Sequence, residues 1–334
     1  MYSDEELSSA VKAGVMTEAV ANAFRDHVAA ERKIPAVDEE HFRLITGFND
    51  IFVVIACILL LVSVTWIGGA VSPSFGPLLQ AATAWGLAEY FTLQRRMSLP
   101  SIVLLLAFVG GVFATGLSLL ANSGLSADIT KGLPSAVAAL SAWLHWKRFK
   151  VPVTVAAGIG TLAAAVVLLL VGFVPEMRPL ILPLVFFAGI AVFALAMRWD
   201  SSDTKRQTGR SDVAFWLHLL AAPMIVHPVF SMLMFDDAAI GIVQAAIVTT
   251  LYIVIALVSI SIDRRALMVS ALAYVLYAIN SILELYGVVS LGFAFTAFAI
   301  GSGLLLLSAF WHLCRKAIIV YYPPQIREHL PALR

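Results

Sequence analysis

The stretch RWDSSDTKRQTGRSD, residues 198–212, decides how the rest of the sequence is read. It is the longest polar interruption between positions 51 and 313, and the segments on either side are apolar runs. Each run is about as long as a bilayer is thick. Because a charged loop must lie outside the hydrocarbon core, this stretch fixes which side of a membrane the ends of its neighbours occupy. The pattern predicts a multi-pass helical membrane protein.

The composition supports the same prediction. Of the 334 residues, 60% are hydrophobic and 13% are charged, whereas soluble proteins average roughly 25% charged residues. The mean hydropathy is +0.92. A lipid bilayer removes the need to bury so much apolar surface, so we expect the bilayer to be the main partner. A net charge of +1 gives no reason to expect a nucleic acid partner.

The sequence contains no motif for a cofactor or a reaction. The two cysteines, Cys57 and Cys314, form no CxxC or Cys/His spacing, so we expect neither a metal site nor a structural disulfide. GIGTLA at 158–163 has the letters of a dinucleotide fingerprint but lies inside an apolar run, where small residues serve helix packing. We therefore expect no cofactor, and the sequence gives little support for an enzymatic function, although an intramembrane enzyme stays open as a third interpretation.

The apolar runs predict an all-α fold, a polytopic transmembrane bundle. A helix needs about 20 apolar residues to cross the hydrocarbon core. Ten segments approach this length: residues 51–71, 75–93, 100–121, 130–146, 151–173, 179–197, 213–234, 238–261, 266–286 and 288–313. The fourth segment carries Lys131 and Pro134 near one end, so a re-entrant segment is an alternative to a full crossing there.

Basic residues support the ten-span topology, because Lys and Arg are enriched in cytoplasmic loops. With the N-terminus inside, 20 of the 22 basic residues fall in cytoplasmic segments, and only Lys131 and Arg178 fall outside. Without the fourth span, the basic stretch at 144–150 would lie on the wrong side. The sequence therefore favours both termini in the cytoplasm.

Residues 1–48 predict a small cytosolic helical hairpin and a linker. Ser3 and Glu6 fit a capping box, Gly14 marks a helix end and Thr17 can cap a second helix. This hairpin is a candidate binding surface for a protein partner.

The other end of the chain predicts a different element. Residues 314–334 contain Tyr321 and Tyr322, which suit a membrane interface. We expect this segment to be an interfacial tail on the cytoplasmic side, and residues 49–313 to form the membrane domain.

Both ends of the chain resemble those of uncharacterised bacterial multi-pass membrane proteins that share a domain of unknown function. One matching pattern is LSSAVKAGVMTEAVANAF at 7–24, and the other comprises Trp311, Arg315, Pro323 and Leu330 with Pro331. The resemblance implies a bacterial inner-membrane protein and no particular activity. The ten-span count is also similar to that of the drug/metabolite transporter superfamily, which implies two five-helix halves of opposite orientation.

Ionisable groups inside membrane spans are costly, so they are the functional candidates. The seventh span holds His218 and His227, together with Pro223 and Pro228, which can bend a helix and free backbone carbonyls. One interpretation is a kinked helix that carries proton-binding or solute-binding groups. The alternative is two histidines that are hydrogen-bonded within the bundle beside an ordinary kink.

The ninth span carries a polar stripe. Tyr274, Tyr277, Asn280 and Glu284 are three or four residues apart and therefore share one helical face. The stripe can line a polar cleft, but Glu284 lies near the outer interface, where hydration alone explains it equally well.

Glu89 in the second span is the remaining candidate. It lies close in sequence to Arg95 and Arg96. Its carboxylate can extend to the interface, or it can accept a proton near His218.

Two functions are favoured by the sequence. The first is a small-solute, proton-coupled transporter-like protein, because histidine titrates near neutral pH. Its polar lining would be Glu89, His218, His227, Asn280 and Glu284. The second is a non-transporting scaffold or assembly factor that acts through residues 1–48.

Overall fold

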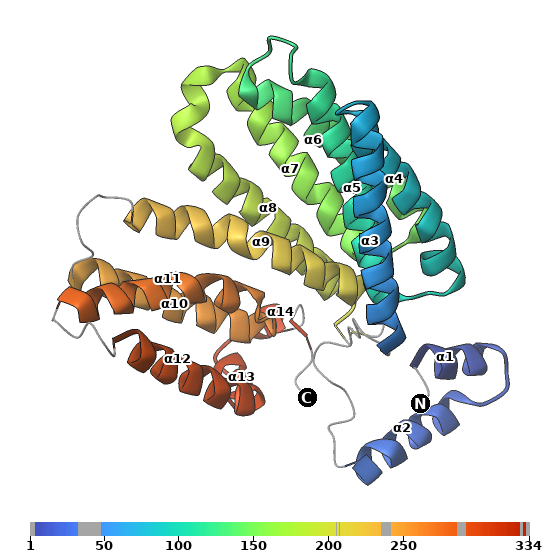
Figure 1. Cartoon of the computed structure of the whole chain (residues 1–334). Helices are drawn as coiled ribbons and strands as arrows, with labels where there is room; N and C mark the ends of the chain where they lie inside the picture. Colours follow the sequence, from blue (N-terminus) through green and yellow to red (C-terminus); the bar gives the residue numbers. More distant parts are fainter. Residues whose placement is uncertain are drawn as a thin grey trace. The chain divides into compact units, whose positions relative to one another are not determined.

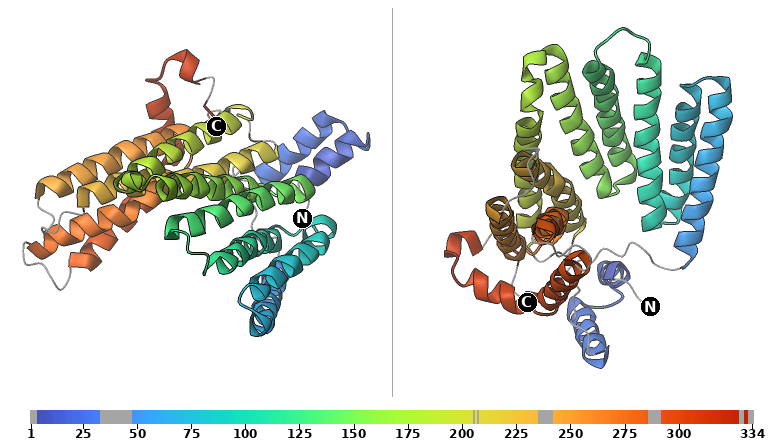
Figure 2. Two further views of the ribbon diagram at one scale, coloured as in Figure 1. Left: turned by 90° about the horizontal axis from the view of Figure 1, so that it is seen from above. Right: turned by 60° about the vertical axis from the view of Figure 1, so that its left-hand side comes forward.

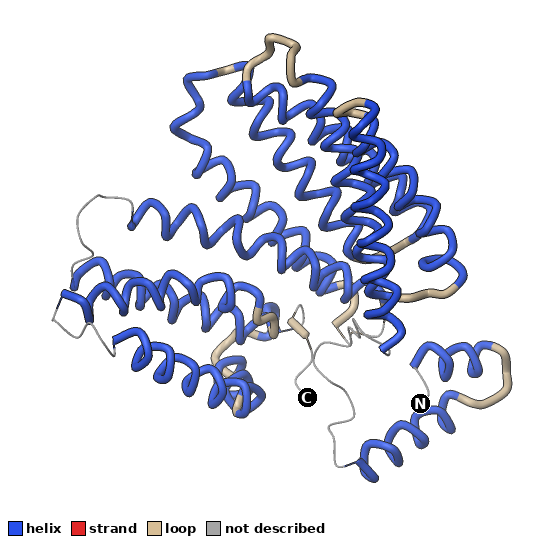
Figure 3. The backbone as a smooth tube through the Cα atoms, in the orientation of Figure 1, coloured by secondary structure: helices blue, strands red, loops and turns tan. Residues whose placement is uncertain are grey.

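A computed structural model shows an all-α chain, and the residues it describes contain helices and loops but no strand (Figure 3). The described residues are 4–32, 48–204, 206, 208–234, 242–285, 292–327 and 330–331. The chain divides into two compact units, Met1–Arg43 and Leu44–Arg334.

The smaller unit is a pair of helices, α1 (Asp4–Lys12) and α2 (Glu18–Arg32). The two helices contact each other. Leu7 from α1 and Ala21 from α2 are buried. The predicted helices at this end of the chain are therefore confirmed.

The signals that bound these helices act as expected. Gly14 adopts a φ of 72°, a conformation that glycine tolerates and that ends α1. The Thr17 hydroxyl accepts a hydrogen bond from the Val20 backbone N–H at 3.3 Å, as an N-cap does. The proposed cap at Ser3 lies outside the described residues.

The larger unit begins with a row of helices in which neighbours in sequence pack against each other (Figures 1 and 2). Short connections require consecutive helices to run in opposite directions. The row consists of α3 (Phe48–Val71), α4 (Phe75–Ala88), the π-helix η1 (Glu89–Gln94), α5 (Ser98–Leu120), α6 (Ala127–Phe149), α7 (Val153–Phe173), the 3-10 helix η2 (Pro175–Leu180) and α8 (Ile181–Ser201).

The rest of this unit consists of α9 (Gly209–Met234), α10 (Ile242–Ile262), α11 (Ala266–Leu285), α12 (Gly292–Ala309), α13 (Trp311–Ile319) and α14 (Pro324–Arg327). Helix α9 packs against α7, α8 and α11, so it joins the two groups. Half of the apolar window of α9 is buried, against 17–28% in the other helices that can cross a membrane. Helix α9 is therefore more enclosed by other parts of the chain than the other four helices of this kind.

Among the described residues, five helices are long and apolar enough to cross a membrane, and six if the bent pair α12 and α13 counts as one. The five are α3, α5, α7, η2 with α8, and α9. The remaining predicted spans also correspond to helices, but length and composition do not establish that these cross. Helix α6 is continuous over 23 residues with Pro134 inside it, so no break separates its two halves.

The last predicted span, 288–313, is interrupted. Helix α12 ends at Ala309, and the chain turns by 71° before α13 begins at Trp311. Residues 288–291 lie outside the described residues. After the bend, the indole of Trp311 and the guanidinium of Arg315 in α13 lie beside the buried carboxylate of Asp263.

Helices α8 and α9 approach closely. A Cβ atom added at Gly189 would lie 2.9 Å from the Met224 carbonyl carbon, which is too close for any larger residue without a backbone shift. This close contact lies along the middle of the helix pair, and Asp200 meets His218 further along the same interface.

Candidate functional site

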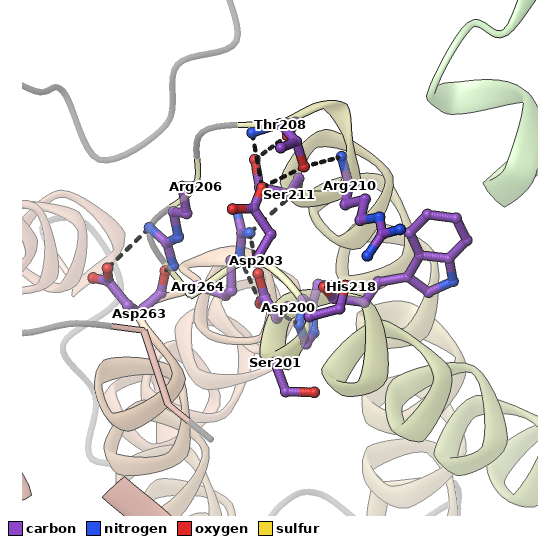
Figure 4. A network of polar contacts seen from close by, with 12 residues as sticks. Asp200, Ser201, Asp203, Arg206, Thr208, Arg210, Ser211, His218, Asp263 and Arg264 are labelled. Atoms are coloured by element: carbon purple, nitrogen blue, oxygen red, sulfur yellow. Dashed lines mark hydrogen bonds and ion pairs between the residues drawn. The ribbon is translucent and has the colours of Figure 1, made fainter. Parts of the chain in front are cut away.

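A network of buried charged groups lies at the junction of α8, α9 and the turn between α10 and α11 (Figure 4). Asp200, near the end of α8, is 1% exposed. Its carboxylate accepts hydrogen bonds from Arg264 Nε at 3.1 Å and Nη2 at 2.6 Å. It also lies 3.1 Å from His218 Nε2. The two-bond contact with a planar guanidinium is among the stronger hydrogen-bond arrangements in proteins.

A second ion pair lies beside the first. Arg206, in the loop between α8 and α9, places Nη1 2.9 Å from Asp263 Oδ2 and donates from Nη2 to the Asp263 carbonyl at 3.0 Å. Trp311 Nε1 donates to Asp263 Oδ1 at 2.8 Å, and Arg315 Nη1 lies 3.8 Å from Oδ2. Asp263 therefore binds both the loop and α13.

The two ion pairs connect the same two segments, and in each pair the acid and the base come from different segments. The end of α8 and its loop contribute one acid and one base, Asp200 and Arg206, and the turn contributes Asp263 and Arg264. Arg206 and Asp263 have φ values of 53° and 59°, in the left-handed region. Such a residue carries a conformational cost of about 1–3 kcal/mol, which the surrounding contacts must offset.

Further hydrogen bonds close the network. Arg264 Nη2 donates to the Ser211 carbonyl at 3.2 Å, and the Ser259 hydroxyl donates to the Arg264 carbonyl. In the loop, the Asp203 carboxylate accepts from the Thr208 backbone N–H at 2.8 Å and from its hydroxyl at 2.7 Å. The described residues of the polar stretch that separates the apolar runs are thus held by hydrogen bonds and ion pairs.

The C-terminal segment also contributes to the junction. Arg315 is 2% exposed and its Nη2 donates to the Pro331 carbonyl at 2.6 Å. The Tyr322 hydroxyl lies 3.1 Å from the Ser261 hydroxyl, and Leu330 packs in a cluster with Ile262. Tyr322 and Leu330 therefore pack against the end of α10, whereas Tyr321, which precedes Tyr322 in sequence, is 89% exposed.

The loop guanidinium remains a cation in this environment. Burial, reinforced by the nearby Arg264, lowers the pKa of Arg206, and Asp263 opposes that shift. Because the ordinary pKa of arginine is about 12.5 or higher, Arg206 keeps its charge at neutral pH. The junction is therefore held by ionic contacts from which water is excluded.

His218 is the one predicted residue that lies within this network. It is 1% exposed, and the Phe193 ring lies 5.3 Å from it in an edge arrangement. A carboxylate held by an arginine only accepts hydrogen bonds, so Nε2 carries the hydrogen and Nδ1 has a free lone pair. In the part of the chain that the structure describes, Nδ1 has no hydrogen-bond partner. The ring therefore presents a buried proton acceptor.

His227 occupies a different environment. Its Nδ1 lies 2.5 Å from the Tyr274 hydroxyl and 3.2 Å from the Ser231 hydroxyl. Nine residues at about 100° each place it on the face of α9 opposite His218. The structure thus brings the seventh and ninth predicted spans together through His227 and Tyr274, but it does not place the two histidines on one surface.

The other candidates on α9 and α11 are placed as follows. Pro223 and Pro228 lie inside α9, which runs unbroken from Gly209 to Met234. Asn280 and Glu284 lie on the backbone of α11, but their side chains are outside the described residues.

Glu89 binds a partner that the sequence did not indicate. Its carboxylate accepts from Arg148 Nε at 2.9 Å and Nη2 at 2.7 Å, so the partner comes from α6. The structure does not show a contact between Glu89 and His218. Glu89 therefore joins two helix ends of the first row, where both side chains are partly exposed.

Sequence reasoning missed most of the network, namely Asp200, Arg206, Asp263, Arg264, Trp311 and Arg315. The loop charges were interpreted only as markers of membrane side. One signal was present: only residues 263–265 separate α10 from α11, and so short a turn keeps its charges close to both helices.

Within the described residues, no group of three or more His, Cys, Asp or Glu side chains is arranged to hold a metal ion. No protein family matches the chain, and comparisons with curated proteins and with solved structures find no similar protein.

Proposed function

We propose that the chain is a proton-coupled, transporter-like protein for a small solute, located in a bacterial inner membrane with both termini in the cytoplasm. One observation carries the proposal: His218 presents a buried proton acceptor inside an ion network that joins separate helices. A proton-coupled cycle needs a group that titrates near neutral pH and a junction whose stability depends on that group.

The charges around His218 give the direction of the response. The groups that face it are Asp200 from α8, Arg264 from the turn and Arg206 from the loop, with the Phe193 ring. A proton on Nδ1 would produce an imidazolium ion that competes with Arg264 for one carboxylate. Buried charges without full compensation are costly, and water relieves that cost. Proton uptake therefore favours an open junction.

The solute pathway that we propose follows α9 and α11. His227 and Tyr274 meet between these helices, and Asn280 and Glu284 lie further along α11. In this arrangement the ion network is a gate at the junction of α8, α9 and the turn between α10 and α11. The proton on His218 controls whether this gate is open.

Hydrogen–deuterium exchange of the full chain in lipid nanodiscs tests the proton response. Two conditions on either side of the ordinary pKa of histidine, about pH 8 and about pH 5.5, are compared after correction for intrinsic exchange rates. We expect acid to increase deuterium uptake in peptides that cover 198–212 and 259–268. We expect His218→Gln to remove that increase, because the amide cannot take up a proton.

A buried histidine elsewhere provides the control. His145 is completely buried and packs against the rings of Phe108 and Phe149, in the first row of helices. His145→Gln should leave the acid response of the two peptides intact. An equal acid response in wild type and His218→Gln would exclude His218 as the proton site.

A second function, a non-transporting scaffold or assembly factor, is favoured by one observation. In the N-terminal unit, Val15 is 77% exposed and Val20 is 55% exposed. Exposed apolar groups on a small helical hairpin are typical of a surface that binds another protein. Under this function, the acid response described above is absent.

A further inference from the structure

A patch of exposed basic and aromatic side chains lies where η1 and α6 end. We call it the basic–aromatic patch, and its members are Tyr90, Arg95, Arg96, Trp143, Lys147 and Lys150. None of these residues belongs to the ion network around Asp200.

Two contacts show that the ends of η1 and α6 lie together. Glu89 at the start of η1 forms an ion pair with Arg148 at 2.7 Å. Below it, the Trp85 and Phe149 rings pack edge to face at 5.0 Å. The C-terminal end of α6 therefore lies beside the point where α4 passes into η1, and the basic residues that follow each of these segments lie at the same end of the helices.

The cations of the patch are held beside aromatic rings. Lys147 Nζ lies 3.8 Å from the centre of the Trp143 ring, and Lys150 Nζ lies 5.3 Å from that of Trp146. On η1, Arg95 lies 5.5 Å from the Tyr90 ring. Tryptophan and tyrosine are enriched at the level of lipid headgroups. Rings in that layer place the cations beside the headgroup phosphates.

The patch carries positive charge that the described part of the chain does not neutralise. Arg148 binds Glu89, but no described carboxylate forms an ion pair with Arg95, Arg96, Lys147 or Lys150. The dipole of α6 favours cations near its C-terminal end, yet it provides no counter-ion.

Two of these basic residues also occupy unusual backbone positions. Arg96 and Lys150 have φ values of 51° and 56°. Glycine is the usual residue in this conformation at a helix end, because it has no side chain to clash. Here the chain carries a long basic side chain at both positions instead.

An apolar stripe leads from the patch along α6. Val137, Leu140 and Leu144 are exposed, and with Lys147 they are spaced three or four residues apart on one face. A phospholipid has chemical groups in the same order, because its acyl chains can lie against the apolar stripe while its phosphate lies beside Lys147. The neighbouring helices α5 and α7 are both able to cross a membrane, so lipid lies within reach.

We propose that the basic–aromatic patch binds the phosphate group of an anionic phospholipid in the leaflet that it faces. Each basic residue near an anionic membrane surface contributes about 1 kcal/mol, which is about fivefold in affinity. The patch therefore prefers an anionic lipid over a zwitterionic lipid with the same acyl chains. This preference is independent of proton coupling at His218.

Native mass spectrometry of the full chain in detergent tests this proposal. The protein is titrated with dioleoyl phosphatidylglycerol, with dioleoyl phosphatidylcholine, and with inorganic phosphate as a competitor. We expect tighter binding of phosphatidylglycerol, and we expect Lys147→Gln with Lys150→Gln to weaken it by at least about fivefold. Inorganic phosphate should not displace the lipid.

The matched control also removes two positive charges, but from the opposite end of α6 and from η2. Lys131 is exposed and Arg178 pairs with Asp128, so Lys131→Gln with Arg178→Gln should keep the lipid preference. Thermal unfolding checks that each variant is folded. If the double variant Lys147→Gln with Lys150→Gln does not fold, the single variant Lys147→Gln is tested in its place. Equal binding of both lipids, an equal loss in the control, or displacement by phosphate would each overturn the proposal.

Discussion

Replacing Asp200 with asparagine is expected to lower the free energy of unfolding by about 3–5 kcal/mol, because a buried ion pair loses one partner. The carboxylate is 1% exposed and accepts two hydrogen bonds from Arg264, which is 3% exposed. An asparagine fits the space but leaves the guanidinium charge without compensation. Chemical unfolding of the purified protein in mixed micelles measures the change.

An exposed ion pair provides the comparison. The side chain of Arg178 is 62% exposed and that of its partner Asp128 is 16% exposed, so water reaches this pair through the guanidinium. Asp128→Asn should lower stability by less than Asp200→Asn does, because water screens the Arg178 guanidinium that is left behind. If both substitutions had the same small effect, Asp200 would be solvated and the buried network would be wrong.

Replacing Trp311 with alanine is expected to cost about 3–5 kcal/mol, the range for a large aromatic side chain lost from a core. Trp311 is 1% exposed, packs with Ile260 and Met268, and donates a hydrogen bond to Asp263. The substitution leaves a cavity and also removes a donor from a buried carboxylate. The same unfolding experiment measures the loss.

Trp66 is the matched control, because it is 80% exposed on α3. Trp66→Ala removes the same number of atoms with little loss of packing, so we expect a much smaller change. Similar losses for both tryptophans would mean that α13 is not packed as the structure shows. Trp311→Phe separates the two contributions, because it keeps a ring but loses the indole N–H.

The sequence predicts the helices well because their signals are local. Apolar runs end at polar residues or glycine, so the predicted segment at 51–71 corresponds to Phe48–Val71 and that at 151–173 to Val153–Phe173. The end of α1 at Gly14 and the cap at Thr17 depend only on nearby backbone geometry. Such features do not depend on where distant segments lie.

The sequence predicts ten membrane crossings, and the structure supports fewer of them than it supports helices. Helix α6 contains Asp128, Lys131 and Pro134 within an otherwise apolar pattern, and α4 has only 14 residues. Length and composition separate five or six clear candidates from the rest. The remaining helices depend on packing and on the surrounding lipid, which composition does not encode.

The site was predicted only in part, and the reason is physical. An ionisable residue in an apolar helix is costly, which identifies His218 from its own segment. Its partners come from elsewhere: Arg264 and Asp200 are 64 residues apart. Basic residues beside an apolar run fit the enrichment of Lys and Arg in cytoplasmic loops whether their side chains face water or bind a carboxylate. The local sequence therefore does not distinguish a solvated charge from a buried ion pair.

Trp311 illustrates the same limit. At the end of an apolar run, a tryptophan is typical of a membrane interface. Here the chain bends by 71° before it, and the indole binds Asp263 across 48 residues. A contact between distant segments thus overrides the local preference.

The central claim is that a proton on His218 opens the junction to water, and the accessibility of Ala214→Cys tests it most directly. Ala214 is completely buried, one turn before His218 on α9. The substitution is made in a Cys57→Ser, Cys314→Ser background. A membrane-impermeant thiol reagent is added from the side of the membrane on which we propose that the loop at 198–212 lies. Gly209→Cys, which would meet no atom within 4 Å, corrects for the effect of pH on the reagent.

Relative to that control, we predict that Ala214→Cys is protected at about pH 8 and labelled at about pH 5.5, two conditions on either side of the ordinary pKa of histidine. We also predict that adding His218→Gln removes the labelling in acid. Equal protection of Ala214→Cys under both conditions, or labelling in acid that persists with His218→Gln, would contradict the account.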